Sequence, residues 1–216
     1  MPPATPGIEK VAPIRYTAMQ MLSVLKPITE KSLQPVAHLL RNVNPNFITL
    51  LGLIFPVLFL VCLVNGEYLL ALVAFIFNAV DLLDGLVARA QNKVTAFGGF
   101  LDSTVDRFAD FVVIVAFGFA GLVGWEIVLT VVLLTYLISY IRSRTELAAK
   151  GKLVASVGIM ERTERLVLIF VGLAVYAVWQ HVELFDQNLI TITFLILLIL
   201  SAITVGQRIM FAYKKL

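Results

Sequence analysis

The sequence is poor in the residues that support a soluble or disulfide-linked fold. Cys62 is the single cysteine among 216 residues, so no intrachain disulfide can form, and His38 and His181 are isolated and are not expected to form a metal pair. Charged residues make up 14% of the chain, against about 25% in soluble domains. Apolar residues make up 60%, instead of about 45–50%. The composition therefore excludes an ordinary soluble domain and predicts a membrane protein, for which we expect no nucleic-acid partner.

What the sequence does have is long apolar runs. A hydrocarbon core needs roughly 20 helical residues to cross it. The candidate segments are Phe47–Asn65, Tyr68–Arg89, Gly98–Val123, Ile127–Ile141, Leu166–Gln180 and Leu189–Phe211. The fourth and fifth are short as apolar runs, and we expect both helices to extend into their polar flanks. We predict an all-α, polytopic membrane protein with six transmembrane helices.

The basic residues lie on one side of this arrangement. All 17 Lys and Arg residues fall in the N-terminal region, around the second connection, in the fourth connection or at the C-terminal end. The other connections, near Gly66, Gly124 and Phe185, carry only acidic charges. Because basic residues mark the cytoplasmic side, we predict a multi-pass protein of the cytoplasmic membrane with both termini in the cytoplasm.

The chain before the first span divides into two parts. Residues 1–15 contain four prolines and no apolar run, so we predict a disordered tail and no signal peptide. Residues 16–43 place apolar side chains at helical spacing, which predicts an amphipathic juxtamembrane helix region on the cytoplasmic surface, with a partly ordered tail as the alternative. Asn44 and Pro45 suit the cap and the first position of a helix, so the six-helix domain is expected to cover residues 44–216.

Five aspartates fall inside the second and third spans: Asp81, Asp84, Asp102, Asp106 and Asp110. A carboxylate within a membrane is costly, so each is a functional candidate. Asp81 and Asp84 lie on one face of the second span, and Asp102 and Asp106 on one face of the third. A short turn near residues 91–96 makes the two spans antiparallel neighbours. Folding this hairpin about its centre places Asp81 level with Asp106, so the four carboxylates converge at one depth.

Such a site needs cations, because four carboxylates cannot stay ionised together in a poorly solvated place. Oxygen ligands favour Mg²⁺ or Mn²⁺, and two such ions can stabilise the attacking and leaving oxygens of a phosphoryl transfer. The hairpin register also sets Gly85 level with Asp102 and Arg89 level with Gly98. Gly85 and Gly98 would let a ligand approach the helix backbone closely, and Arg89 would pair with the negative charge of a phosphate. A proton or cation pathway, and carboxylates paired with Arg89 and Arg107, are alternatives.

The spacing of these residues also carries a family resemblance. The chain reads Asp81-Leu-Leu-Asp84-Gly85-Leu-Val-Ala88-Arg89, eight residues, Gly98, three residues, Asp102, three residues, Asp106. This pattern resembles the signature of the CDP-alcohol phosphotransferases, with every motif position filled. The resemblance covers most of the chain. It implies a homodimeric enzyme with a polar cavity open to the cytoplasm, which transfers a phosphatidyl-type group from a CDP-linked lipid to an alcohol and releases CMP.

The resemblance also implies roles for individual residues. The metal ligands would be Asp81, Asp84, Asp102 and Asp106, and Asp106 would also act as the general base. The CDP group would be held by Gly85, Ala88, Arg89 and Gly98, with Asn46 and Thr49 as further candidates. Asp110 continues the Asp102–Asp106 face outside the motif, and we expect it to be structural.

The acceptor is the next question, and the basic residues of the last three spans bear on it. Convergent arginines suit a phosphorylated acceptor. The segments Tyr140–Glu146 and Glu161–Arg165, with the pair Gln207-Arg208, resemble the prokaryotic phosphatidylinositol-phosphate and archaetidylinositol-phosphate synthases. That resemblance implies inositol 1-phosphate as acceptor, with its phosphate bound by Arg142, Arg144, Arg165 and Arg208. Glycerol 3-phosphate, serine, free inositol and a CDP-inositol donor are alternatives.

The other basic residues of this side are assigned to general charge bias. They are Lys150, Lys152, Arg162, Lys214 and Lys215. Two functions from other classes are kept beside the enzyme: a cation or proton transporter and a membrane assembly factor. The acidic groups lie on one hairpin and no ionisable residue continues a path outward, which argues against the transporter.

Overall fold

The computed structural model describes residues 43–77, 87–89, 91, 94–151, 153–180, 182–184 and 186–216. Its helices are α3 (Pro45–Leu51), α4 (Ile54–Val64), α5 (Tyr68–Phe77), α7 (Ala96–Phe119), α8 (Trp125–Ala148), α9 (Arg162–Val178) and α10 (Leu189–Lys215). Strands β1 (Glu183–Leu184) and β2 (Gln187–Asn188) form a small antiparallel pair. The predicted tail, nearly all of the predicted juxtamembrane region, and Asp81, Asp84 and Gly85 lie outside the described residues.

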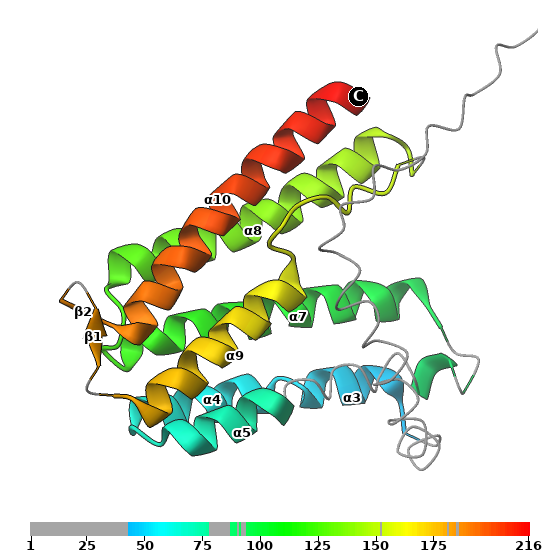
Figure 1. Ribbon diagram of the computed structural model, residues 1–216. Helices are drawn as coiled ribbons and strands as arrows, with labels where there is room; N and C mark the ends of the chain where they lie inside the picture. Colours follow the sequence, from blue (N-terminus) through cyan, green and yellow to red (C-terminus); the bar gives the residue numbers. More distant parts are fainter. Residues whose placement is uncertain are drawn as a thin grey trace, which may run out of the picture.

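The helices form a bundle in which α7 has a central place. Helices α8 and α10 lie side by side, and α4 packs against α5 on the opposite side (Figure 1). Helix α7 contacts α3 and α4 on one side and α8 on the other, while α9 contacts α5 and α10. Helix α7 therefore connects the first half of the described chain with the second.

The middle of the bundle is held by aromatic rings from three helices. Phe59 of α4, Phe117 of α7 and Phe194 of α10 are fully buried, with ring centroids 5.7 Å apart for the first pair and 4.8 Å for the second. Close packing of helices in lipid depends on such contacts and on small residues. Gly172 of α9 is such a small residue: a Cβ there would lie 2.5 Å from Cγ2 of Thr193 on α10.

Several predicted helix boundaries are confirmed and others move outward. Asn44 caps α3, its Oδ1 accepting a hydrogen bond from the Asn46 amide at 3.0 Å, and Pro45 is the first helical residue. As expected, the fourth and fifth apolar runs extend into polar flanks: α8 reaches Ala148 and α9 begins at Arg162. The helical prediction is confirmed in the main. The β1–β2 pair is a small departure from an all-α chain that the sequence reading missed.

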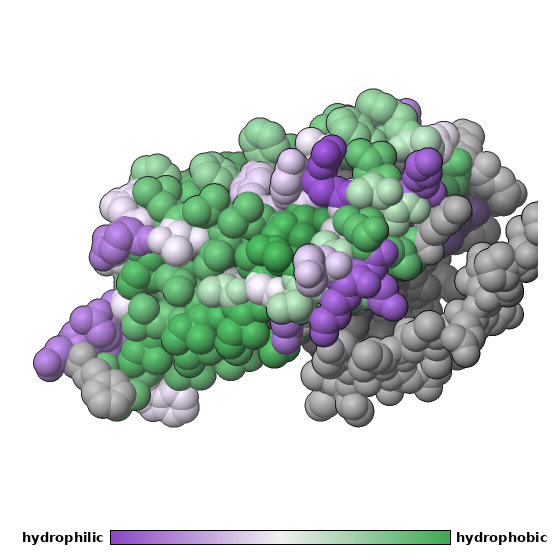
Figure 2. Space-filling view, turned by 90° about the horizontal axis from the view of Figure 1, so that it is seen from above, coloured by the Kyte–Doolittle hydropathy of each residue, from purple (hydrophilic) through white to green (hydrophobic). Residues whose placement is uncertain are grey.

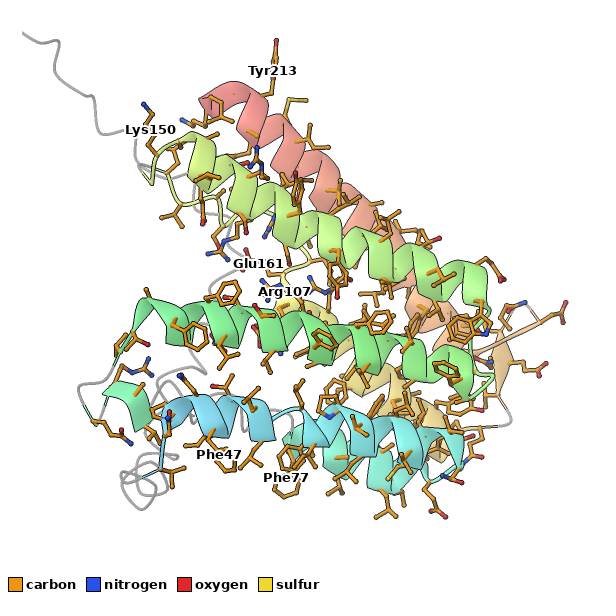
Figure 3. The ribbon with its side chains drawn as sticks, turned by 180° about the vertical axis from the view of Figure 1, so that it is seen from behind. Phe47, Phe77, Arg107, Lys150, Glu161 and Tyr213 are labelled. Carbon is orange, nitrogen blue, oxygen red and sulfur yellow. The ribbon has the colours of Figure 1, made fainter. Side chains whose placement is uncertain are left out.

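The surface and the helix lengths fit a membrane-integral protein. Among the described residues, the stretches Pro45–Val64, Trp125–Ala148 and Leu189–Lys215 are long and apolar enough to cross a membrane, and Tyr68–Phe77 is a shorter apolar helix. Apolar residues cover much of the face in Figure 2, with hydrophilic residues gathered in separate groups. The exposed rings of Phe47 and Phe77 point away from α7 (Figure 3). The count of six spans stays a prediction.

Candidate functional site

A pocket of about 240 Å³ opens where the start of α3 meets the first turns of α7. Six of the predicted site residues line it together: Asn46, Thr49, Ala88, Arg89, Gly98 and Asp102. The predicted hairpin register sets Arg89 level with Gly98, and both belong to this wall. Five of the six nucleotide candidates and one metal candidate thus share one cavity, and Gly85, the sixth, lies outside the described residues.

Local hydrogen bonds hold the walls of this pocket. Thr95 caps α7 by accepting a hydrogen bond from the Gly98 amide on its Oγ1 at 3.0 Å. Gln91 donates from Nε2 to the carbonyl of Val43 at 2.7 Å, which ties the segment before α7 to the chain before α3. A Cβ on Gly98 would lie 3.1 Å from the capping Oγ1 of Thr95 and 3.4 Å from Oδ1 of Asn46, so a side chain there would crowd the cap of α7.

The carboxylate face of α7 continues from the pocket toward α9. Asp102 lines the pocket, and Asp106 follows one helical turn later. The side chain of Asp106 is 15% exposed; its Oδ1 lies 2.6 Å from Nη1 of Arg162 and its Oδ2 lies 3.3 Å from Nη1 of Arg107. The predicted alternative of a carboxylate paired with Arg107 is therefore present, with Arg162 as a further partner.

The donor set on this face fits a hard divalent cation. Carboxylate oxygens on one helical face are the ligands that Mg²⁺ and Mn²⁺ prefer. Asp102 and Asp106 supply such oxygens, while Asp81 and Asp84 lie outside the described residues. Within the described part of the chain, no group of three or more His, Cys, Asp or Glu side chains gathers around one point.

Asp110, one turn beyond Asp106, is buried and ion-paired, which supports the structural role predicted for it. Its side chain is 3% exposed, and its two oxygens lie 3.1 Å from Nε of Arg162 and 3.0 Å from Nη2 of Arg165. These two ion pairs join α7 to the first turn of α9. Sequence reasoning assigned Arg162 to charge bias and missed this contact. The available signal was the matched spacing: two carboxylates one turn apart and two arginines one turn apart.

The four predicted acceptor arginines differ in how they are placed. Arg208 is 4% exposed and donates from Nε to Val157 O at 2.7 Å, from Nη1 to Ile138 O at 2.6 Å and from Nη2 to Glu161 Oε1 at 3.2 Å. Arg165 is equally buried and holds Asp110.

The other two are exposed. Arg142 pairs with Glu146 at 3.1 Å, and Arg144 lies at the surface of α8. Glu161 accepts from Nη2 of Arg208 on its carboxylate and from the Arg165 amide on its carbonyl at 3.1 Å, so these two arginines share a neighbour. Glu161, an Arg208 partner, lies between α7 and α8 in the view of Figure 3, as does Arg107.

This geometry agrees with the comparison to known proteins. Residues 42–212 match the model of the CDP-alcohol phosphatidyltransferase family. The chain belongs to this family. A CDP-alcohol phosphatidyltransferase is a transferase, so the transporter and assembly-factor alternatives are wrong.

Named relatives and solved structures resemble most of the chain. An archaetidylinositol phosphate synthase of Pyrococcus horikoshii is 36% identical over 203 residues, covering 91% of this chain and 98% of the relative. A phosphatidylinositol phosphate synthase of Cutibacterium acnes is 36% identical, covering 82% and 90%.

Two crystal structures of Mycobacterium tuberculosis phosphatidylinositol phosphate synthase, one with CDP-DAG bound and one with manganese and citrate, each give a TM-score of 0.70. The first is 26% identical to this chain, and the match covers 83% of this chain and 92% of the crystallised one. The second is 27% identical, and the match covers 83% and 88%.

Proposed function

We propose that this CDP-alcohol phosphatidyltransferase transfers the phosphatidyl-type group of a CDP-linked lipid to inositol 1-phosphate and releases CMP. The observation that carries the proposal is the pocket in which Asn46, Ala88, Arg89, Gly98 and Asp102 meet. Ala88, Arg89, Gly98 and Asp102 of the signature line this one cavity, which supports a shared ligand site. Farther along α7, Asp110 contacts Arg165 of α9, one of the proposed acceptor residues. Relatives named for phosphatidylinositol phosphate and archaetidylinositol phosphate synthesis support the acceptor.

One set of residues would bind the donor and another the acceptor. Asn46, Thr49, Ala88 and Gly98, with Gly85, would surround the cytidine diphosphate, and Arg89 would pair with its phosphates. Two ions of Mg²⁺ or Mn²⁺, held by Asp81, Asp84, Asp102 and Asp106, would supply charge stabilisation at the phosphates.

Asp106 would accept the proton of the acceptor hydroxyl, whose oxygen forms the new bond to the lipid-bearing phosphorus as the bond to CMP breaks. Arg142, Arg144, Arg165 and Arg208 would bind the acceptor phosphate. Both termini and the site would face the cytoplasm in a homodimer of six-span protomers.

The test is CMP release by purified protein in lipid nanodiscs. CDP-diacylglycerol and CDP-archaeol would each be combined with inositol 1-phosphate, glycerol 3-phosphate, free inositol and serine, with Mg²⁺, Mn²⁺ or EDTA. We expect CMP release with inositol 1-phosphate and either metal, and none in EDTA. Equal or faster turnover with glycerol 3-phosphate would reject the acceptor. Asp106→Asn is expected to abolish turnover while sparing donor binding; undiminished turnover would remove Asp106 as the base.

A further inference from the structure

Arg162 bridges two carboxylates that the proposed function treats differently. Its Nη1 lies 2.6 Å from Oδ1 of Asp106, a proposed metal ligand, and its Nε lies 3.1 Å from Oδ1 of Asp110, which lies outside the signature. The side chain of Arg162 is 27% exposed. One guanidinium from the first turn of α9 therefore holds two successive turns of α7.

Asp110 does not depend on Arg162 alone. Its Oδ2 lies 3.0 Å from Nη2 of Arg165, whose side chain is 4% exposed and also donates from Nη1 to the carbonyl of Met160 at 3.4 Å. A buried charge left without a partner is costly, and this fixed pair prevents that cost at Asp110. Arg162 can thus leave Asp106 without leaving Asp110 unpaired.

The same oxygen of Asp106 cannot serve Arg162 and a divalent cation at once. A guanidinium beside the carboxylate also repels a cation that approaches it, and this repulsion is strong in a poorly solvated site. Arg107, half-buried on the same helix, contacts Oδ2 of Asp106 at 3.3 Å, so among the described residues at least two guanidinium groups lie against this carboxylate.

We propose that Arg162 is a positioning residue that occupies Asp106 in the substrate-free protein and is displaced when a divalent cation binds. The inference rests on the proposed metal role of Asp106. Arg162 keeps the carboxylate face neutral and holds metal affinity low until the CDP-linked donor adds its phosphate charges. Removing the guanidinium therefore strengthens metal binding to the protein without substrate, a change that the loss of a merely structural contact would not produce.

The test measures Mn²⁺ affinity of nucleotide-free protein by the electron paramagnetic resonance signal of free Mn²⁺. For Arg162→Gln we expect the Kd to fall about tenfold or more. Lys214→Gln removes the same unit charge from the exposed end of α10 and is expected to leave the Kd unchanged. Adding CDP-diacylglycerol is expected to narrow the difference between Arg162→Gln and the wild type.

An unchanged or weaker Mn²⁺ affinity in Arg162→Gln overturns the inference. If that variant does not fold, Arg162→Lys replaces it. The single nitrogen of lysine cannot bridge both carboxylates, so an intermediate Kd for Mn²⁺ is expected. A wild-type Kd in Arg162→Lys would then overturn the inference. Asp106→Asn distinguishes a failure of the proposed metal site from a failure of the role proposed for Arg162. Wild-type Mn²⁺ binding in Asp106→Asn rejects the metal role itself, whereas lost binding there with an unchanged Arg162→Gln rejects the role of Arg162 alone.

Discussion

Replacing Arg208 by alanine removes three hydrogen bonds from one buried guanidinium. The partners are the carbonyls of Ile138 on α8 and Val157 in the α8–α9 connection, and the carboxylate of Glu161 just before α9. Thr204, one turn earlier on α10, accepts the Met160 amide at 3.0 Å. Arg208 therefore fastens the α8–α9 connection to the end of the bundle, whatever else it binds.

The magnitude follows from burial and partner number. Removing one member of a buried charged network costs about 3–5 kcal/mol, because the remaining polar groups lose their partners. For a chain of this size, each 1 kcal/mol lowers Tm by about 2–4 °C, so Arg208→Ala should unfold about 6–20 °C below the wild type. Arg208→Lys keeps the charge but lacks the planar fork, and an intermediate Tm is expected.

The assay is thermal unfolding of the purified protein in detergent, with Lys214→Ala as control. Lys214 lies on the same helix with an exposed side chain, so its removal should leave Tm unchanged. A fall of less than about 3 °C in Arg208→Ala would refute the reasoning from burial and contacts. The proposed acceptor role has a separate readout: Arg208→Ala should raise the KM for the acceptor far more than the KM for the donor, and equal effects would reject it.

Three further predictions concern the pocket, a helix cap and the exposed arginines. Gly98→Ala should raise the donor KM about threefold or more, and by more than Gly99→Ala, because only the first adds a Cβ against Thr95 and α3. Asn188→Ala should lower Tm by about 2–4 °C or more, since Asn188 caps α10 and also donates to Leu122 O at 2.9 Å. Arg142→Ala and Arg144→Ala should raise the acceptor KM in CMP release while leaving Tm near the wild-type value, because both side chains are exposed.

Local signals predicted the start of the first described helix. The Asn44 cap depends on residues two positions apart, and such short-range hydrogen bonds can be read from sequence. The hairpin register brought Arg89 level with Gly98, because two helices joined by a short turn have few ways to pair. Only the family resemblance predicted a place for Asn46 and Thr49 beside these residues, since no spacing rule relates α3 to α7.

The ion pairs between α7 and α9 could not be predicted in the same way. Periodicity gives the face on which Asp106 and Asp110 lie, but not which distant helix packs against that face. More than 50 residues separate Asp110 from Arg162, and the contact depends on where α9 begins. Arg208 illustrates the same limit: its charge suggested a phosphate ligand, whereas its burial and three protein partners, which only packing determines, add a structural role.

The order of features along α7 gives the proposed reaction a geometry. Gly98 and Asp102 line the pocket, Asp106 follows one turn later, and Asp110 contacts Arg162 and Arg165 of α9. At 1.5 Å per residue these positions span about 18 Å of helix, enough for a diphosphate at one end and a phosphorylated alcohol at the other. The transferred phosphorus must lie between the leaving CMP and the attacking hydroxyl. Along this helix Asp106 lies between the proposed donor pocket and the arginines of α9. The acceptor hydroxyl must reach this same region, which supports Asp106 as the residue proposed to take its proton.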